Sequence, residues 1–469
     1  MARDEQLPLL QRAQDAGEAA LQQIAQALSA RIPAAPGAVA RVLALNPSSA
    51  TVDAVGDVDI DLPGGGSVRP ATCSGCILGT SVELLSQTGG SARLRVFAPK
   101  LQPFSWRAID LVAGDAPAGP QVVVQFFGAD GQTAEAGHAV RAVIFNQRAR
   151  AELSPAGLTS LRIDGAEALS ETSFTVREFQ DQGGLWRMGH EMAGCATTES
   201  AVPQTGSFEL REASKFAARV ALRTGDAVRE VAIEAGGAGV SLALETAARA
   251  ATTRTASFAL AGAGPLTTSL AGGFTQHAGD TLYAPTYWPA VSWAAAGGWA
   301  ILLRQSTGVR RDAAGRVDLL AVRNVAAEQC DIEGPSTDNS DSGTHRIEWR
   351  VERAATPAQA EIAAQAWNRP ARLIAVGIGN GIGNGLPAEA SLMRIEGPGV
   401  ISALKPADRG DGVIVRALLM PGPVSVVPGP LLAGRAATLA DSSERDLSAL
   451  PSLSLRQETA GALQTIRLR

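Results

Sequence analysis

A succession of short β-strand patterns runs along almost the whole chain, and it limits the fold more than any other feature. In these segments apolar residues alternate with polar ones or form short runs, and Gly, Pro, Asp and Asn stand between them. The clearest segments are VDIDLPGG, ARLRVFAP, VVVQFFGADG, SFTVREFQ, ARVALRTG, VSLALETA, WAILLRQ, HRIEWRVE and VIVRALLM. The 50 glycines and 26 prolines supply the turns that so many short strands need. The pattern predicts a mainly β protein of stacked antiparallel β-sandwiches rather than a parallel α/β sheet.

Two segments break this pattern and are expected to be helices. Residues 3–31 carry Leu and Ile at helical spacing, and the segment ends before the linker Pro33-Ala-Ala-Pro36. The apolar positions are Leu7, Leu10, Leu21, Ile24 and Leu28. A single amphipathic helix cannot bury its own stripe, so we expect the chain to begin inside a helical bundle. We also expect residues 1–31 to add little to the stability of the β domains. The second helix is expected at 357–367, after a Thr cap.

Charge and hydropathy exclude two classes of partner. The net charge is −5 and Lys and Arg form no run, whereas a nucleic-acid partner requires a concentrated cationic face. Residues 281–303 carry no charge, but their prolines and glycines favour strand, turn and strand over a membrane span. The start MARDEQ lacks the features of a secretory signal, so a cytoplasmic location is expected.

Cysteine and histidine do not form a metal-ligand pattern. Cys73 and Cys76 make one CxxC pair, but a structural zinc site needs four ligands, and Cys195 and Cys330 are isolated. The histidines stand singly, at His138, His190, His277 and His345. We interpret all of them as ordinary polar or packing residues and expect no metal in this chain.

A glycine-rich segment, VGIGNGIGNG at residues 376–385, invites comparison with nucleotide-binding loops. Its glycines recur at every second position, which matches neither the dinucleotide fingerprint nor a phosphate loop with its Lys-Ser/Thr ending. We interpret it as a flexible connector between two sandwiches, with a boundary near Pro370.

Several longer phrases, taken in chain order, resemble one known family. They include VLALNPSSATVDAVGDVDID (42–61), FNQRARAELSPAGLTSLRIDG (145–165), FQDQGGLWRMGHEM (179–192), GRVDLLAVRNV (315–325), SGTHRIEWRV (342–351) and LKPADRGDGVIVRALL (404–419). Their order and spacing are similar to the region that follows the catalytic domain in α-mannosidases of glycoside hydrolase family 38. Lys405, Asp408 and Asp411 in the last phrase are then expected to form a solvated turn before a strand rather than a site.

The resemblance implies a domain organisation. Residues 1–35 would be a helical-bundle remnant and linker, 36–138 a small β-sandwich, 139–370 a large galactose-mutarotase-like sandwich, and 371–469 a C-terminal sandwich. The catalytic barrel of the family, with its zinc, aspartate nucleophile and acid/base carboxylate, would precede Met1. The sequence itself marks no pair of carboxylates of the kind that retaining glycosidases use. Whether the chain is an enzyme therefore stays open.

The resemblance also suggests residues that face sugar. Trp186 and Arg187 lie in the loop DQGGLWRMGHE, and Arg323 lies at a strand end. Trp186 would stack on a sugar ring, and the two arginines would donate to hydroxyls. Tyr287 and Trp288, close to Trp293, form a second aromatic cluster suited to binding or to a domain interface. The competing interpretation is that Trp186 fills a core and that Arg323 pairs locally.

Two functions of different classes follow as expectations. The first is the non-catalytic β half of an α-mannosidase-like hydrolase, which closes the sugar pocket for mannosides and binds a catalytic chain through the helix at 3–31. The second is a stand-alone carbohydrate-binding or scaffold protein derived from such a hydrolase. A lone enzyme with an unrelated active site is a third class, and no residue pattern supports it.

Overall fold

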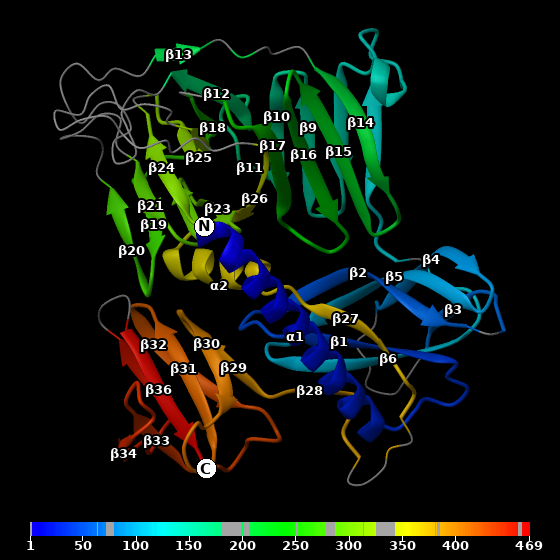
Figure 1. Cartoon of the computed structure of the whole chain (residues 1–469), viewed down its shortest axis with the longest axis vertical. Coiled ribbons are helices and arrows are strands. Elements are labelled where there is room, and N and C mark those ends of the chain that lie inside the picture. The colour runs from blue at the N-terminus through cyan, green and yellow to red at the C-terminus, as the bar shows by residue number, and fades with distance from the viewer. Residues whose placement is uncertain are drawn as a thin grey trace. The chain divides into compact units, whose positions relative to one another are not determined.

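The computed structural model describes residues 2–62, 64–71, 79–117, 119–180, 198–200, 202, 206–249, 252–277, 287–312, 314–324, 343–379, 381, 385–457 and 462–469 (Figure 1). The chain divides into two compact units, each assembled from separate stretches of sequence. Unit 1 comprises Met1–Gly119, Arg369–Arg394 and Val426–Arg435, and unit 2 comprises Pro120–Asn368, Ile395–Ser425 and Ala436–Arg469. The predicted domain boundaries at 36, 139 and 371 stay predictions.

Unit 1 is built from one helix and two antiparallel sheets. Its elements are α1 (Ala2–Arg31), β1 (Ala40–Asn46), β2 (Val52–Asp61), β3 (Val68–Pro70), β4 (Ser81–Thr88), β5 (Ser91–Leu101), β6 (Ser105–Ala113), β27 (Arg372–Val376) and β28 (Glu389–Ser391). One sheet has the order β27-β1-β6-β28, with β3 also paired to β6, and the other has the order β2-β5-β4. Val42 and Leu111 of the first sheet and Leu94 and Val96 of the second meet in one buried core.

The second half of α1 packs on the first sheet (Figure 1). Ala25 is buried together with Leu43 and Trp106, and Leu21 and Leu28 pack against the same cluster. Of the predicted stripe, Leu10 and Ile24 are instead exposed. The side chain of Leu7 lies outside the described part.

A buried arginine fixes the end of this helix to the sheet. Arg41 of β1 donates to the carbonyl oxygens of Ile32 and Pro33, each at 2.9 Å. Its Nε also donates to Asp110 at 2.5 Å. The structure contradicts the expectation that residues 1–31 add little to stability, because their removal would expose this core and strip Arg41 of its partner at Ser29.

The glycine-rich segment has a packing role in its described part. Gly377 O accepts a hydrogen bond from Ser29 Oγ at 2.6 Å. A Cβ at Gly379 would overlap the carbonyl oxygen of Ser29, and Gly381 has a φ of +67° beside Pro33. Gly379 and Gly381 are therefore required where the chain passes close to the end of α1, and the interpretation as a flexible connector is wrong for these two residues.

Unit 2 contains a large two-sheet sandwich and further antiparallel sheets. The strands before the second helix are β7 (Val123–Phe127), β8 (Arg141–Phe145), β9 (Ala149–Ser154), β10 (Gly157–Ile163), β11 (Ala166–Glu167), β12 (Thr175–Gln180), β13 (Thr198–Ser200), β14 (Ser207–Ala213), β15 (Ala217–Thr224), β16 (Ala227–Glu234), β17 (Val240–Ala247), β18 (Thr252–Phe258), β19 (Leu266–Leu270), β20 (Gly273–His277), β21 (Trp288–Ala290), β22 (Trp293–Ala296), β23 (Trp299–Leu303), β24 (Thr307–Arg311), β25 (Val317–Asn324) and β26 (Thr344–Arg353). The orders are β11-β10-β9-β8-β7, β13-β12-β18-β25-β24-β21 and β14-β15-β16-β17-β26-β23-β22-β19-β20.

The six-stranded and nine-stranded sheets share an aromatic core. Phe174, next to β12, stacks on Phe258 of β18 at 5.7 Å between ring centroids. It also meets Trp349 of β26 edge to face at 6.1 Å. These rings join the inner faces of the two sheets, as expected for a sandwich.

The second helix, α2 (Pro357–Asn368), begins as predicted after a Thr cap, Thr356. Gln359 N donates to Thr356 Oγ1 at 3.3 Å, and Ala355 N donates to Gln359 Oε1 at 2.8 Å. Ala360 and Ala364 pack on the core beneath the nine-stranded sheet. On another side of the helix, Ala358 and Ile362 pack against Val400, Leu418 and Met420 of the C-terminal region.

The C-terminal region adds two more sheets. Its strands are β29 (Met393–Glu396), β30 (Gly399–Pro406), β31 (Val413–Leu419), β32 (Gly422–Pro428), β33 (Ala437–Ala440), β34 (Asp446–Ala449), β35 (Ser454–Gln457) and β36 (Ala462–Leu468). Their orders are β29-β32-β35 and β30-β31-β36-β33-β34. Every described strand pairing is antiparallel, so the predicted mainly β fold is confirmed.

The uncharged stretch at 281–303 forms strands over its described part, residues 287–303, as predicted. Of the two helices that the described ranges contain, neither combines the length and the apolar character needed to cross a membrane.

Candidate functional site

The outer face of the six-stranded sheet, the side away from the nine-stranded sheet, carries an unusual set of polar side chains. Directly paired residues share a face in an antiparallel sheet. Arg310 of β24 pairs with Asp318 of β25, and Asp318 pairs with Ser257 of β18. Two rows along the same face, Phe179 of β12 pairs with Thr253. These residues alternate along their strands with core residues, so they lie on the outer face.

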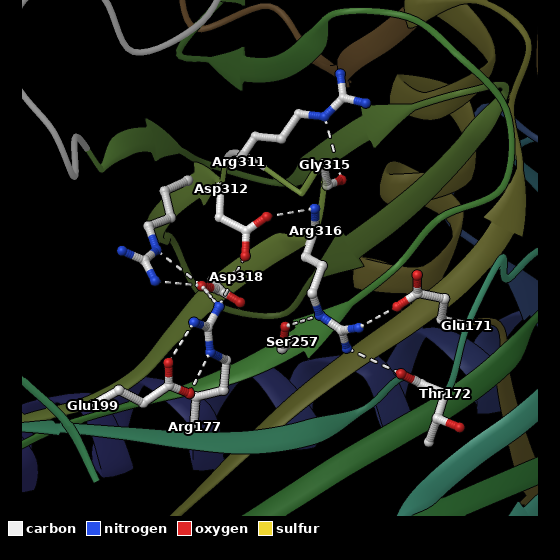
Figure 2. A network of polar contacts seen from close by, with 11 residues as sticks. Glu171, Thr172, Arg177, Glu199, Ser257, Arg311, Asp312, Gly315, Arg316 and Asp318 are labelled. Atoms are coloured by element: carbon white, nitrogen blue, oxygen red, sulfur yellow. Dashed lines mark hydrogen bonds and ion pairs between the residues drawn. The ribbon is translucent and has the colours of Figure 1, made fainter.

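An ion network ties four strands together on this face (Figure 2). Arg177 of β12 donates to Asp318 Oδ2 at 2.9 Å and to Asp312 Oδ2 at 3.1 Å. It also forms a two-bond fork with Glu199 of β13, at 2.8 and 2.7 Å. Arg310 binds the same Oδ2 of Asp318 through Nε and Nη2, both at 2.8 Å. Asp318 is thus the shared acceptor of two guanidinium groups.

A neighbouring arginine extends the network (Figure 2). Arg316 donates to Ser257 Oγ and to Glu171 Oε2, each at 3.1 Å, and to the carbonyl of Thr172 at 3.0 Å. Its backbone N–H donates to Asp312 Oδ1 at 2.9 Å. The turn between β24 and β25 is therefore bound both to its own Asp312 and to residues that precede β12.

Aromatic rings lie against the two network arginines. The Arg310 guanidinium carbon is 4.9 Å from the ring centre of Phe179 and 5.4 Å from that of Tyr287. The Arg177 carbon is 5.2 Å from the same Phe179 ring. Flat guanidinium groups stack on aromatic faces, so these contacts add to the charge pairs.

Two buried polar atoms on this face have no hydrogen-bond partner among the described residues. They are Asp318 Oδ1 and Thr255 Oγ1, and both residues are 0% exposed. Buried polar groups in folded proteins are nearly always paired. The outer face therefore retains acceptor capacity that the described side chains do not use.

The network also shifts the acidity of its members. The hydrogen bonds from Arg177 hold the pKa of Glu199 below its ordinary value. The bonds to Glu199 in turn raise the pKa of Arg177. Both groups are therefore charged at neutral pH and hold each other through charge-assisted hydrogen bonds.

The predicted sugar-facing residues are placed as follows. Tyr287 lies on the outer face against Arg310. Arg323 pairs with Thr253 and shares that face. Trp288 of β21 pairs with the buried Val309 and therefore lies on the opposite, inner face, where its ring stacks on His277 with 4.3 Å between ring centroids. The predicted aromatic cluster of Tyr287 and Trp288 is thus divided between the two faces of the sheet. Trp186 and Arg187 lie outside the described residues.

Trp293 does not belong to this cluster. It is fully buried in β22 of the nine-stranded sheet, and its Nε1 donates to Glu361 of α2 at 2.8 Å. Its proximity to Tyr287 and Trp288 in sequence does not bring it to the outer face. The four cysteines and His190 also lie outside the described part, and within that part no group of three or more metal-ligating side chains occurs.

Sequence reasoning missed Arg177, Arg310 and Asp318. The signal for Arg310 and Asp318 is the phrase GVRRDAAGRVDLL, in which a strand and its return strand both place charge among buried apolar residues. Such charges on opposed strands indicate a cross-strand pair.

The expected turn after Lys405 connects β30 and β31 in a hairpin, and Lys405 makes ion pairs that the prediction did not include. Lys405 Nζ pairs with Asp408 Oδ1 at 2.5 Å and with the buried Glu444 at 2.6 Å. Asp411 is exposed and pairs with Arg469 at 3.2 Å. The expectation of a solvated turn holds for the two aspartates, while Lys405 is bound to a buried carboxylate.

Comparison with known proteins gives a likeness in fold. No protein-family model matches the sequence, and no curated protein matches it. A solved structure described as a glycosyl hydrolase family 38 protein from Enterococcus faecalis aligns over 98% of this chain and 62% of its own, with a TM-score of 0.69 and 13% identity. An α-mannosidase from Enterococcus faecalis V583 aligns over 94% of this chain and 57% of its own, with a TM-score of 0.70 and 13% identity. This chain thus has the fold of part of those proteins and spans less than two thirds of their length.

Proposed function

We propose that this chain is the non-catalytic β half of an α-mannosidase-like glycoside hydrolase and that it contributes one wall of a sugar site. The observation that carries the proposal is the likeness of nearly the whole chain to parts of two solved proteins, one described as glycosyl hydrolase family 38 and one as an α-mannosidase. The same family is the one that the collinear sequence phrases resemble. Mannosides are the proposed substrate class of the assembled enzyme.

The outer face supplies chemistry that suits a sugar. The ring of Tyr287 offers a surface for the C–H face of a pyranose. Arg323 carries forked donors for hydroxyl groups. Trp288, the next residue in β21, shares the opposite face with Val309 and stacks on His277 of the nine-stranded sheet, so it is not part of the outer face. We assign carbohydrate contact to Tyr287 and Arg323, with Trp186 and Arg187 as further candidates from the sequence.

The catalytic carboxylates and the zinc would come from another domain or chain. Residues 8–20 of α1 are exposed along their whole length, whereas the second half of the helix is docked. We propose this exposed half as the surface that contacts the catalytic part. Its neighbouring apolar residues Leu9 and Leu10 are more than half exposed, which suits a helix that completes a bundle.

One observation favours the stand-alone alternative. The buried side chains of α1 are covered by its own sheet through Leu43, Trp106 and Arg41, so the docked half requires no second chain. A carbohydrate-binding protein derived from such a hydrolase would retain the outer face and dispense with the partner.

The test is hydrolysis of an aryl α-mannoside by the purified full chain, with and without zinc, together with a binding titration of methyl α-D-mannopyranoside. The proposal predicts saturable binding and no turnover under either condition. Zinc-dependent turnover by the chain alone would place two working carboxylates within these residues and overturn it. Mannoside binding is then measured in the presence of a catalytic partner, before and after residues 8–20 are made polar. Unchanged binding would favour the stand-alone alternative.

A further inference from the structure

We propose that Arg310 is the positioning residue of Tyr287: it holds the tyrosine ring on the outer face in the orientation that meets a sugar. The inference deepens the proposed function and rests on it only for the identity of the ligand as a sugar. The placement of the ring by Arg310 stands on contacts within the sheet.

Arg310 is itself held in one place. It is 8% exposed, and its Nε and Nη2 both bind Oδ2 of the fully buried Asp318, directly across the β24–β25 pair. Two bonds to one buried oxygen restrict rotation of the guanidinium plane.

Asp318 is in turn held on the same face by an arginine of strand β12. Arg177 donates to the same Oδ2, and the fork to Glu199 and the bond to Asp312 anchor Arg177. The position of Arg310 is therefore set by a chain of charge pairs that begins on β13 and crosses β12 and β25.

The ring of Tyr287 packs against strand β24. It directly precedes β21, and its neighbour Trp288 pairs with Val309, so Tyr287 lies opposite Arg310 in the same register. A Cβ added to Gly308 would come within 3.2 Å of Tyr287 Cβ and 3.3 Å of its Cδ1. Gly308 thus leaves room beneath the ring, and Arg310, two residues along the strand, lies against the ring.

The residue type matters at this position. Arg310 has Phe179 at 4.9 Å and Tyr287 at 5.4 Å, so it fills the space between two rings. A planar guanidinium can stack on rings while its edge binds a carboxylate, and a lysine ammonium cannot do both. Substitution of Arg310 should therefore weaken sugar binding by displacing the Tyr287 ring, and not by the loss of a direct contact between Arg310 and the sugar.

The chain has only two tyrosines, which makes the placement directly measurable. In the full chain with Tyr283→Phe, labelling with 3-fluorotyrosine gives a single ¹⁹F line from Tyr287. We expect Arg310→Met to move and broaden this line, Arg310→Lys to do so less, and Gly308→Ala to move it without touching any charge pair.

The matched control is Arg304→Met, which removes another arginine that lies over an aromatic ring, 4.1 Å from Trp367. This control should leave the Tyr287 line unchanged. An unmoved line in Arg310→Met, in a protein whose near-ultraviolet circular dichroism shows it folded, would overturn the inference. Movement of the line equally in Arg304→Met would also overturn it.

A double-mutant cycle tests whether the effect passes through the ring. For methyl α-D-mannopyranoside, Arg310→Met and Tyr287→Leu should each weaken binding by about fivefold, from the size of cation–π and stacking contacts. The double variant should lose little more than either single variant, because the two residues act as one unit. Losses that multiply would contradict the positioning role. If the unmodified chain does not bind the probe, the proposed function fails, while the ¹⁹F result still decides the placement of the ring.

Discussion

The two faces of the six-stranded sheet both bury charged residues, but the faces differ in how completely these residues are hydrogen-bonded. On the inner face, Arg254 binds Glu178 at 2.6 Å, Thr246 at 2.5 Å and Asp226 at 3.0 Å. On the outer face, Asp318 accepts from two arginines through Oδ2, and its Oδ1 has no described partner. A fully satisfied cluster rigidifies the sandwich, whereas a buried acceptor without a described partner is an exception in folded proteins.

The largest expected effect lies on the inner face. Arg254→Met leaves Glu178 buried without its main partner, so we expect a loss of ~3–5 kcal/mol in the free energy of unfolding. Urea denaturation measures it, and the affinity for methyl α-D-mannopyranoside in the remaining folded protein should not change. If Arg254→Met costs no more stability than an exposed substitution, the inner cluster is not the stabilising one and the comparison fails.

A pair of threonine substitutions sharpens the contrast with a smaller effect. Thr246→Val removes the hydroxyl that accepts from Arg254, so we expect a cost of ~1–3 kcal/mol. Thr255→Val removes a buried hydroxyl without a described partner, so it should cost no stability and can add some. Thermal unfolding of the two variants side by side checks the difference. Equal losses would show that Thr255 is as fully bonded as Thr246.

The smallest expected effect depends on pH. Because Arg177 lowers the pKa of Glu199 below its ordinary value of 4.5, the pair stabilises the fold fully above about pH 4.5 and loses this contribution as the pH falls through the folded-state pKa. Glu199 is half exposed, so the contribution is screened and amounts to less than ~1 kcal/mol. Stability measured from pH 7 to pH 3 should fall less steeply in Glu199→Gln than in the unmodified chain. Parallel curves would remove this pair from the account.

Much of the fold could be predicted because it depends on local patterns. The alternation along strands, the Thr cap before α2 and the helical spacing at 3–31 all act within a few residues of sequence. The role of Gly379 could not be predicted in this way, because it is set by contact with Ser29, which lies far away in the chain.

The site was harder to predict for the same reason. Trp293 stands six residues after Tyr287, but an intervening turn places it in the other sheet, where it packs on α2. Arg177 and Asp318 are charged residues in strands, and strand parity alone does not show which face is buried. The family resemblance, and not local pattern, is what directed attention to Arg323.

The central claim is that the outer face of the six-stranded sheet binds carbohydrate. The most direct measurement is a titration of the full chain, labelled with 3-fluorotyrosine and carrying Tyr283→Phe, with methyl α-D-mannopyranoside. The account predicts a saturable movement of the Tyr287 line that is strongly reduced in Arg323→Met and retained in Arg304→Met. A Tyr287 line that does not move as the sugar rises into the tens of millimolar would contradict it.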